Sequence, residues 1–279
     1  MPEPSLIRLD NVGVTFPARG SSQPFRALGG FNLTIAAESA KIIAIAGESG
    51  SGKTTLGRIT LGMLQPTEGT MTYRGQTLQQ MDRKEHASFR REVQAIFQDP
   101  YSVFNPFYRV DHLLHMPLKI FGITRDRKAA DAKIEEALSR VGLKPEQVLG
   151  RYPHQLSGGQ RQRIVVARSL MLRPRLIVAD EPVSMIDASL RATILNRIAA
   201  LRDELGISII YITHDLATAR QVADELYVLY RGETVESGSA EQVLSNPQHD
   251  YTRLLVGSIP RPDPDRPWAV PSDAEPSAG

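Results

Sequence analysis

The chain has 279 residues, enough for one large domain with its own core or for one domain with a small insert. Its 33 Lys and Arg residues nearly balance its 31 Asp and Glu residues, so a net charge of +2 gives no reason to expect a nucleic-acid partner. The absence of cysteine excludes disulfides and fits a reducing compartment, and the lack of an apolar stretch of ~18 residues predicts no membrane-spanning helix.

The first elements expected are antiparallel strands. Leu6–Phe16 and Phe31–Ile35 alternate apolar and polar residues, as half-exposed strands do. Met71–Tyr73 is a shorter candidate strand and precedes the turn-forming pair Arg74-Gly75. The residues before Leu6 lack the basic-then-apolar pattern of a signal peptide, so we expect none.

A phosphate-binding pattern follows the next strand. Ile42–Ala46 is continuously apolar, as a parallel strand covered on both faces requires. The pattern G-x-x-x-x-G-K-[ST] then occurs in the strand–loop–helix context that it needs, as Gly47, Glu48, Ser49, Gly50, Ser51, Gly52, Lys53 and Thr54, with Thr55 next. Lys53 would reach the β- and γ-phosphates, and the Thr54 hydroxyl would bind Mg²⁺. A plain Gly/Ser connection is the alternative, and the register of Lys53 and Thr54 argues against it.

The middle of the chain predicts a helical insert. Val93–Phe97 is an apolar run that ends at Gln98, which alone would be an ordinary solvated loop residue. From about residue 101 to 172 the pattern is helical, and Lys128–Val141 carries one apolar stripe before the stop signal Gly142. We therefore expect an α-helical subdomain at about residues 101–172.

A second anion site is predicted inside this insert. Arg161–Leu170 is predicted as a helix that stops before Pro174, which makes Ser157 its N-cap. Backbone amides would then be free at the positive end of the helix dipole. The segment consists of Leu156, Ser157, Gly158, Gly159 and Gln160. A flexible turn is the plain alternative. The three arginines Arg161, Arg163 and Arg168 are expected to form a local anionic contact face.

Polar side chains follow two further buried strands. Leu176–Ala179 runs into Asp180 and Glu181, and Ser208–Thr213 runs into His214. Singly, such residues would also suit a polar rim or the first turn of a helix.

The last third of the chain predicts a helix, a hairpin and a tail. Asp187 is placed to cap the helix Ala188–Leu205. Leu226–Tyr230 and Glu233–Glu236 form a predicted closing hairpin. We place one domain at residues 1–259, followed by a proline-rich, extended or disordered tail at residues 260–279.

In this order, over roughly residues 6–260, the segments resemble the ATP-binding-cassette (ABC) ATPases. The resemblance implies an α/β, P-loop NTPase fold with an N-terminal antiparallel β region and an inserted α-helical subdomain. It implies that Gln98 links Mg²⁺ and the attacking water to the partner interface, that Asp180 is a second Mg²⁺ anchor, and that Glu181 polarises the water. It also gives His214 a contact with the γ-phosphate. It places Asp187 in the D-loop, where Met185-Ile186 departs from the commoner Ala-Leu.

The resemblance further implies a site shared between subunits. Ser157, Gly158, Gly159 and Gln160 of one subunit would complete the ATP site of another, in a head-to-tail homodimer or heterodimer. Phe16 is the best match for the aromatic residue that stacks on the adenine, and Phe25 competes with it.

Three stretches are similar to the dipeptide, oligopeptide and nickel importer ATPases: Gln98–Pro106, Tyr152–Gln155 and Tyr251–Leu255. Asp250 departs from the proline usual before that tyrosine, and no cysteine is present for the iron–sulfur ligands of some relatives. Ser184–Arg191 also resembles members tied to oligosaccharide import, so the solute stays open.

The implied partners are two integral-membrane permeases and, indirectly, an extracellular or periplasmic solute-binding protein, with no nucleic acid. The implied location is peripheral, at the cytoplasmic face of the membrane. A soluble ABC ATPase acting on nucleic acid or ribosomes is the alternative. It would usually carry two cassettes or a coiled-coil insert. The apolar segment Tyr101–Pro106 is predicted to help form a groove for a permease helix, or else to fold back onto the helical subdomain.

Overall fold

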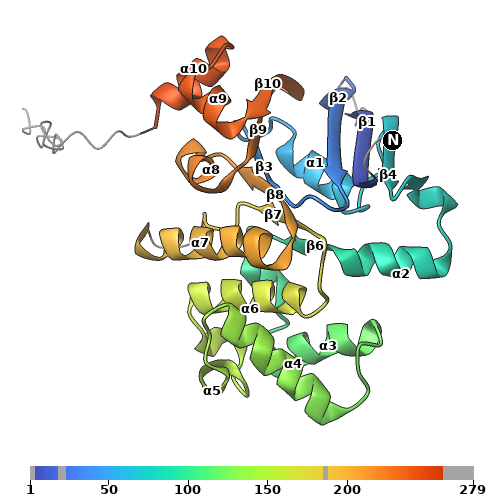
Figure 1. Cartoon of the computed structure of the whole chain (residues 1–279), viewed down its shortest axis with the longest axis vertical. Coiled ribbons are helices and arrows are strands. Elements are labelled where there is room, and N and C mark those ends of the chain that lie inside the picture. Colours follow the sequence, from blue (N-terminus) through green and yellow to red (C-terminus); the bar gives the residue numbers. More distant parts are fainter. Residues whose placement is uncertain (1–3, 18–22, 185–187, 260–279) are drawn as a thin grey trace, which may run out of the picture.

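The computed structural model describes residues 4–17, 23–184 and 188–259 (Figure 1). Its strands are β1 Ser5–Phe16, β2 Phe25–Ala36, β3 Ile42–Ala46, β4 Glu68–Tyr73, β5 Gln76–Thr77, β6 Val93–Ile96, β7 Leu176–Asp180, β8 Ser208–Thr213, β9 Glu225–Tyr230 and β10 Glu233–Ser239. Its α-helices are α1 Lys53–Thr60, α2 Arg83–Glu92, α3 Val110–Ile120, α4 Arg127–Arg140, α5 Pro145–Val148, α6 Gly158–Leu170, α7 Ala188–Leu205, α8 Leu216–Val222, α9 Ala240–Ser245 and α10 Asp250–Gly257. Short 3₁₀ turns occur at Leu78–Gln80, Pro100–Val103 and Pro153–Gln155.

The strands form two sheets. The N-terminal sheet is antiparallel, in the order β2-β1-β4-β5. The central sheet has the order β10-β9-β3-β8-β7-β6, in which the neighbours from β9 to β6 pair in parallel and β10 closes an antiparallel hairpin with β9. The parallel strands therefore bring the ends of β3, β6, β7 and β8 to one edge. The predicted α/β cassette fold is confirmed.

The central sheet separates two hydrophobic cores, because alternate residues of a strand point to opposite faces. On β3, Ile43 and Ile45 pack with α1 and the antiparallel sheet, whereas Ile42, Ala44 and Ala46 pack with the helices on the other face. Both sets are buried. This two-sided burial explains why the parallel strands are continuously apolar in the sequence.

The prediction for β2 was too short. The strand begins at Phe25 rather than Phe31, and the pair Gly29-Gly30 lies inside it. The register against β1 shifts here, between the pairs Val12–Phe31 and Val14–Leu28, and Gly30 has a φ of +58°. A β-bulge with a left-handed glycine explains the interrupted alternation that hid the first half of the strand.

The helices α3 to α6 lie between β6 and β7 in the chain and gather at the end of the molecule away from β1 and β2 (Figure 1). Their buried side chains join the core on one face of the central sheet. The structure thus places a helical region where the sequence predicts one, although the exact limits of that subdomain stay a prediction. The predicted tail, residues 260–279, lies outside the described residues.

Candidate active site

The phosphate loop joins β3 to α1, and at two of its positions only glycine fits sterically. Gly47 has a φ of +149°, and a Cβ there would meet the carbonyl oxygen of Leu229. Gly52 is the N-cap of α1 with a φ of +103°, and a Cβ there would lie 2.6 Å from the carbonyl oxygen of Ala27. No side chain caps α1. The positive end of this helix is therefore left to an anion.

Lys53 is the first residue of α1, and its side chain lies along the loop. It is 6% exposed, and its Nζ donates hydrogen bonds of 2.7 Å to the carbonyl oxygens of Gly47 and of Glu48. Burial lowers the pKa of Lys53 below its usual 10.5, against the opposing charges of Glu181 and Asp180. A buried cation held by the loop carbonyls thus lies near two acidic residues.

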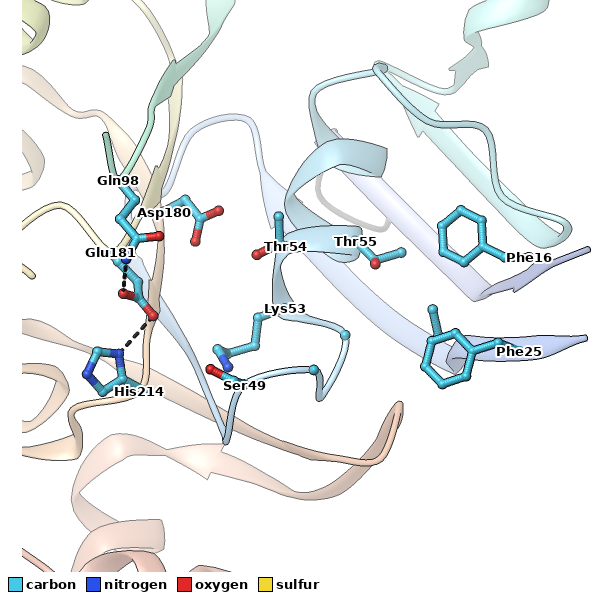
Figure 2. Close-up of a pocket in the computed structure, with 13 residues that line it drawn as sticks. Phe16, Phe25, Ser49, Lys53, Thr54, Thr55, Gln98, Asp180, Glu181 and His214 are labelled. Carbon is cyan, nitrogen blue, oxygen red and sulfur yellow. Dashed lines mark hydrogen bonds and ion pairs between the residues drawn. The ribbon is translucent and has the colours of Figure 1, made fainter. Parts of the chain in front are cut away.

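A cavity of about 520 Å³ opens beside the loop (Figure 2). Residues named from the sequence make up most of its lining: Phe16, Ser49, Gly50, Gly52, Lys53, Thr54, Thr55, Gln98, Asp180, Glu181 and His214. Phe25 and Ala27 complete it. Ala27 was missed, because a lone alanine in a strand carries no chemical signal. Asp187 lies outside the described residues.

Glu181 is held between two side chains. The Nε2 atom of Gln98 donates to Glu181 Oε2 at 2.8 Å, and the Nδ1 atom of His214 lies 2.8 Å from Glu181 Oε1 (Figure 2). The ionised carboxylate only accepts hydrogen bonds, so it pairs with the Nδ1–H tautomer of the histidine. Glu181 itself has a φ of +48°, a strained conformation for a residue with a side chain. The three residues come from the ends of β6, β7 and β8.

Asp180 ends β7 and faces Thr54 across the cavity (Figure 2). Burial and then the neighbouring Glu181 raise the pKa of Asp180, while Thr54 and Lys53 oppose the rise. The described residues contain no cluster of three or more His, Cys, Asp or Glu side chains placed to hold a metal. Thr54, Asp180 and Gln98 instead offer a hydroxyl, a carboxylate and an amide oxygen, a hard-oxygen set that fits Mg²⁺.

Phe16 and Phe25 are cross-strand partners at the end of the β1–β2 pair where the chain passes from one strand to the next. They are 39% and 61% exposed, and both line the cavity on the side away from Glu181 (Figure 2). An apolar wall thus lies opposite the charged one. The structure keeps both residues as candidates for stacking on a base.

The second predicted anion site does not reach this cavity. Ser157 is the N-cap of α6, as predicted: its Oγ accepts from Gln160 N at 3.2 Å, and Gln160 Oε1 accepts from Ser157 N at 2.9 Å. A Cβ on Gly158 would meet open space. None of the residues from 157 to 160 lines the cavity of the same chain.

The prediction that the three arginines of α6 form a face that contacts an anionic partner is wrong. Arg161 is 9% exposed; its guanidinium lies 3.7 Å from the centroid of the Tyr101 ring and donates to the Tyr101 hydroxyl at 2.8 Å. Arg163 donates to the backbone carbonyls of Gly142 and Gly159. Arg168 is partly buried, which lowers its pKa. The arginines on one helix are thus spent on internal packing.

Comparison with known families decides what this arrangement is. Residues 30–184 match the family described as ABC transporter. The chain belongs to this family. Residues 235–278 match a second family, described as the C-terminal region of oligopeptide/dipeptide transporters. The chemistry expected of this ABC transporter chain is therefore that of an ATPase.

Individual relatives agree. The chain is 43% identical to the dipeptide transport ATP-binding protein DppF of Haemophilus influenzae, over 87% of this chain and 73% of the relative. It is 36% identical to the oligopeptide transport ATP-binding protein OppF of Escherichia coli, over 93% and 79%. Among solved structures, the dimeric ATP-binding cassette MJ0796 in a post-hydrolysis state with ADP and Pi matches with a TM-score of 0.73 at 28% identity, covering 84% of this chain and 98% of that one. No helix in the described ranges combines the length and hydropathy of a membrane span.

Proposed function

We propose that this ABC ATPase powers an importer for peptides or related small solutes. The observation that carries the proposal is the combination, in one chain, of the phosphate-loop cavity and a C-terminal region that matches oligopeptide/dipeptide transporters. Relatives named for dipeptide and oligopeptide transport favour a peptide over nickel or an oligosaccharide.

The loop and α1 bind the triphosphate of ATP. The amides at the start of α1 have no side-chain cap and face the phosphates, and Lys53 neutralises the β- and γ-phosphate charge. Lys53 donates to the carbonyls of Gly47 and Glu48. Phosphate oxygens would replace these acceptors when ATP binds, so the Lys53 ammonium would keep hydrogen-bond partners throughout.

Thr54, Asp180 and Gln98 would hold Mg²⁺ beside the phosphates, and the ion, when bound, neutralises charge on the transferred group. Gln98 donates through Nε2 to Glu181, which leaves its amide oxygen available for this task. Glu181 polarises the attacking water. Gln98 and His214 fix the two carboxylate oxygens of Glu181. His214 would also contact the γ-phosphate.

A second subunit would complete the site. Ser157 and the glycines that follow it lie at a helix N-terminus outside the cavity of their own chain, and they would contact a phosphate bound to the loop of another chain. The dimeric cassette MJ0796 supports this arrangement. Asp187 would lie at the same interface. ATP would stabilise the closed dimer, hydrolysis would remove that stabilisation, and the second subunit would be a copy of this chain or a related ATPase.

The permease contact would use a groove of about 260 Å³ between the segment after Gln98 and α3. Val103 and Phe104 line this groove, as predicted, and Phe104 is only 9% exposed and also packs into the core. The rim is more accessible: Met116 is 37% and Ile120 is 68% exposed. A short permease helix with apolar side chains would fit here, and would hold the chain at the cytoplasmic face of the membrane.

Two measurements test this function. The double variant Met116→Asp with Ile120→Ser should keep basal ATPase activity but lose co-purification with the permeases and stimulation of peptide uptake. Met63→Asp, at a 64% exposed methionine outside the groove, is the matched control and should behave like the wild type. Unchanged permease binding in the double variant would remove the groove from the proposal. Co-purification of the wild type with ribosomes or DNA instead of permeases would overturn the transport function.

A further inference from the structure

The C-terminal helix reaches the phosphate loop. The hydroxyl oxygen of Tyr251, in the first turns of α10, accepts a hydrogen bond of 2.9 Å from the backbone amide of Glu48, the second residue of the loop. The two residues are 203 positions apart in the chain. Within the described residues, Lys53 of α1 makes the other side-chain hydrogen bonds to residues 47–52, and Tyr251 makes the one that comes from an element beyond the loop and α1.

The position of Tyr251 is fixed by two sets of contacts, one to its ring and one to the start of its helix. The ring packs against Tyr230 at the end of β9, with 4.3 Å between ring centroids and an interplanar angle of 32°. The start of α10 is fixed by Glu236 of β10, whose carboxylate oxygens accept from the backbone amides of Gln248 at 2.8 Å and of His249 at 3.0 Å. The hydroxyl is therefore presented by an ordered support rather than by a loose surface residue.

The same hairpin touches the loop at two more points. The amide of Gly232 donates to the carbonyl oxygen of Ser51 at 3.2 Å, and the Leu229 carbonyl packs so closely on Gly47 that no Cβ would fit there. The outer side of the phosphate loop thus rests on β9, β10 and α10, while its inner side faces the cavity. Tyr251 supplies the side-chain part of this support.

We propose that Tyr251 is a positioning residue for nucleotide binding: its hydroxyl fixes the Glu48 peptide and so holds the loop amides in the arrangement that receives phosphate. The inference rests on the proposed function. A preorganised loop loses less conformational freedom on binding, so the contribution appears as ATP affinity rather than as the rate of the chemical step. Tyr251 lies outside the matched ABC transporter stretch 30–184 and inside the C-terminal region 235–278. The part of the chain shared with peptide transporters thus helps to shape the ATP site.

The direct test is Tyr251→Phe in the full chain, which keeps the ring against Tyr230 and removes only the hydroxyl. Titration with a fluorescent ATP analogue should show a Kd raised by roughly threefold to tenfold, the range of one neutral hydrogen bond. The KM for ATP should rise with it, while kcat at saturation should stay within about twofold. The matched control is Tyr227→Phe on β9, which removes a phenol hydroxyl away from the loop and should leave both constants unchanged.

A second variant acts on the support instead of the contact. Glu236→Gln weakens the anchor of α10 and should also raise the Kd for ATP. Because both residues act through the same contact, the double variant with Tyr251→Phe should lose less binding free energy than the sum of the two single losses. Equal Kd values for Tyr251→Phe and Tyr227→Phe would overturn the inference. So would a lowered Tm with an unchanged Kd, which is the behaviour of a purely structural tyrosine. Failure of the wild type to bind ATP would instead overturn the proposed function.

Discussion

The N-termini of α1 and α6 are built from similar parts and end in different situations. α1 follows a glycine-rich loop and α6 begins with two glycines, and neither has an acidic residue in its first turn, so both keep the positive end of a helix dipole. At α1 the N-cap is Gly52, with no side chain to satisfy the free amides. At α6 the N-cap is Ser157, in a capping box with Gln160.

The surroundings of the two helix N-termini also differ. The α1 terminus opens into a cavity furnished by its own chain with Lys53, Asp180 and Glu181. The α6 terminus stands apart from that cavity, and its first glycine faces open space. The free N–H groups of an uncapped terminus need a ligand as their hydrogen-bond acceptor. In a capped terminus a side chain of the same chain already accepts from one of them, so the terminus is stable without a partner. The comparison therefore predicts different defects when each end is damaged.

The largest effect is expected from Glu181→Gln, on the α1 side. An amide keeps the shape of the side chain but loses the charge that polarises water, so turnover should fall by at least ~100-fold while ATP still binds. ATP-dependent dimers should accumulate, measurable by size-exclusion chromatography. Glu38→Gln, at an exposed carboxylate between β2 and β3, is the control and should hydrolyse ATP like the wild type. Near-normal turnover of Glu181→Gln would remove this residue from the catalytic role.

The next effect separates the two termini directly. Ser157→Arg should leave ATP affinity of the monomer nearly intact and block closure and turnover, whereas Lys53→Ala should weaken ATP binding itself. In a mixed dimer of the two variants, one site carries both lesions and the other carries neither. Equal mixing should thus restore about a quarter of wild-type turnover if the sites act independently. The absence of recovery in a proven mixed dimer would contradict independent composite sites.

These contrasts also show what the sequence could reveal. The phosphate-loop register and the Ser157 cap are local, because φ values and caps are decided within a few residues, and the structure confirms the cap. The ends of the parallel strands could likewise be placed from continuous apolar runs. The roles of the individual side chains in the cavity stay predictions.

Other features depend on contacts between distant segments and left no local signal. The stack of Arg161 on Tyr101 hides a cation that looks solvated in the sequence. The hydrogen bond from Glu48 to Tyr251 joins residues 203 positions apart in the chain. Phe104 both packs onto the helical core and lines the groove, so the two alternatives that the apolar pattern left open do not exclude each other.

A smaller effect is expected on the base-binding side of the α1 cavity. Phe16→Ala should reduce ATP affinity by about tenfold, the size of one lost base–aromatic stack, and leave affinity for inorganic tripolyphosphate unchanged. Phe25→Ala, at the cross-strand partner, is the matched comparison and should cost less. A larger loss for Phe25→Ala, measured by calorimetric titration, would transfer the stacking role to that residue.

The smallest effect concerns stability without ligand. Burial raises the pKa of Asp180 above its usual 3.8, so the folded chain favours the protonated form. This contribution to stability is present below the usual pKa and is lost as the pH rises through the raised value, so at neutral pH the ionised group costs stability. Asp180→Asn should therefore raise the Tm of the nucleotide-free chain by ~2 °C at pH 7 and remove that part of the acid dependence.

The control for this substitution has the opposite shift. The hydrogen bond from Arg202 lowers the pKa of the exposed Asp203, so Asp203→Asn should not raise the Tm at neutral pH. With Mg²⁺ and ATP, Asp180→Asn should instead have a lower Tm than the wild type. The negative charge that costs stability without ligand is the charge that would hold the ion. Thermal unfolding with and without Mg-ATP measures both. A lower Tm for ligand-free Asp180→Asn would show that the carboxylate is already satisfied by Lys53 and Thr54. The α1 cavity would then be as self-sufficient as the capped end of α6.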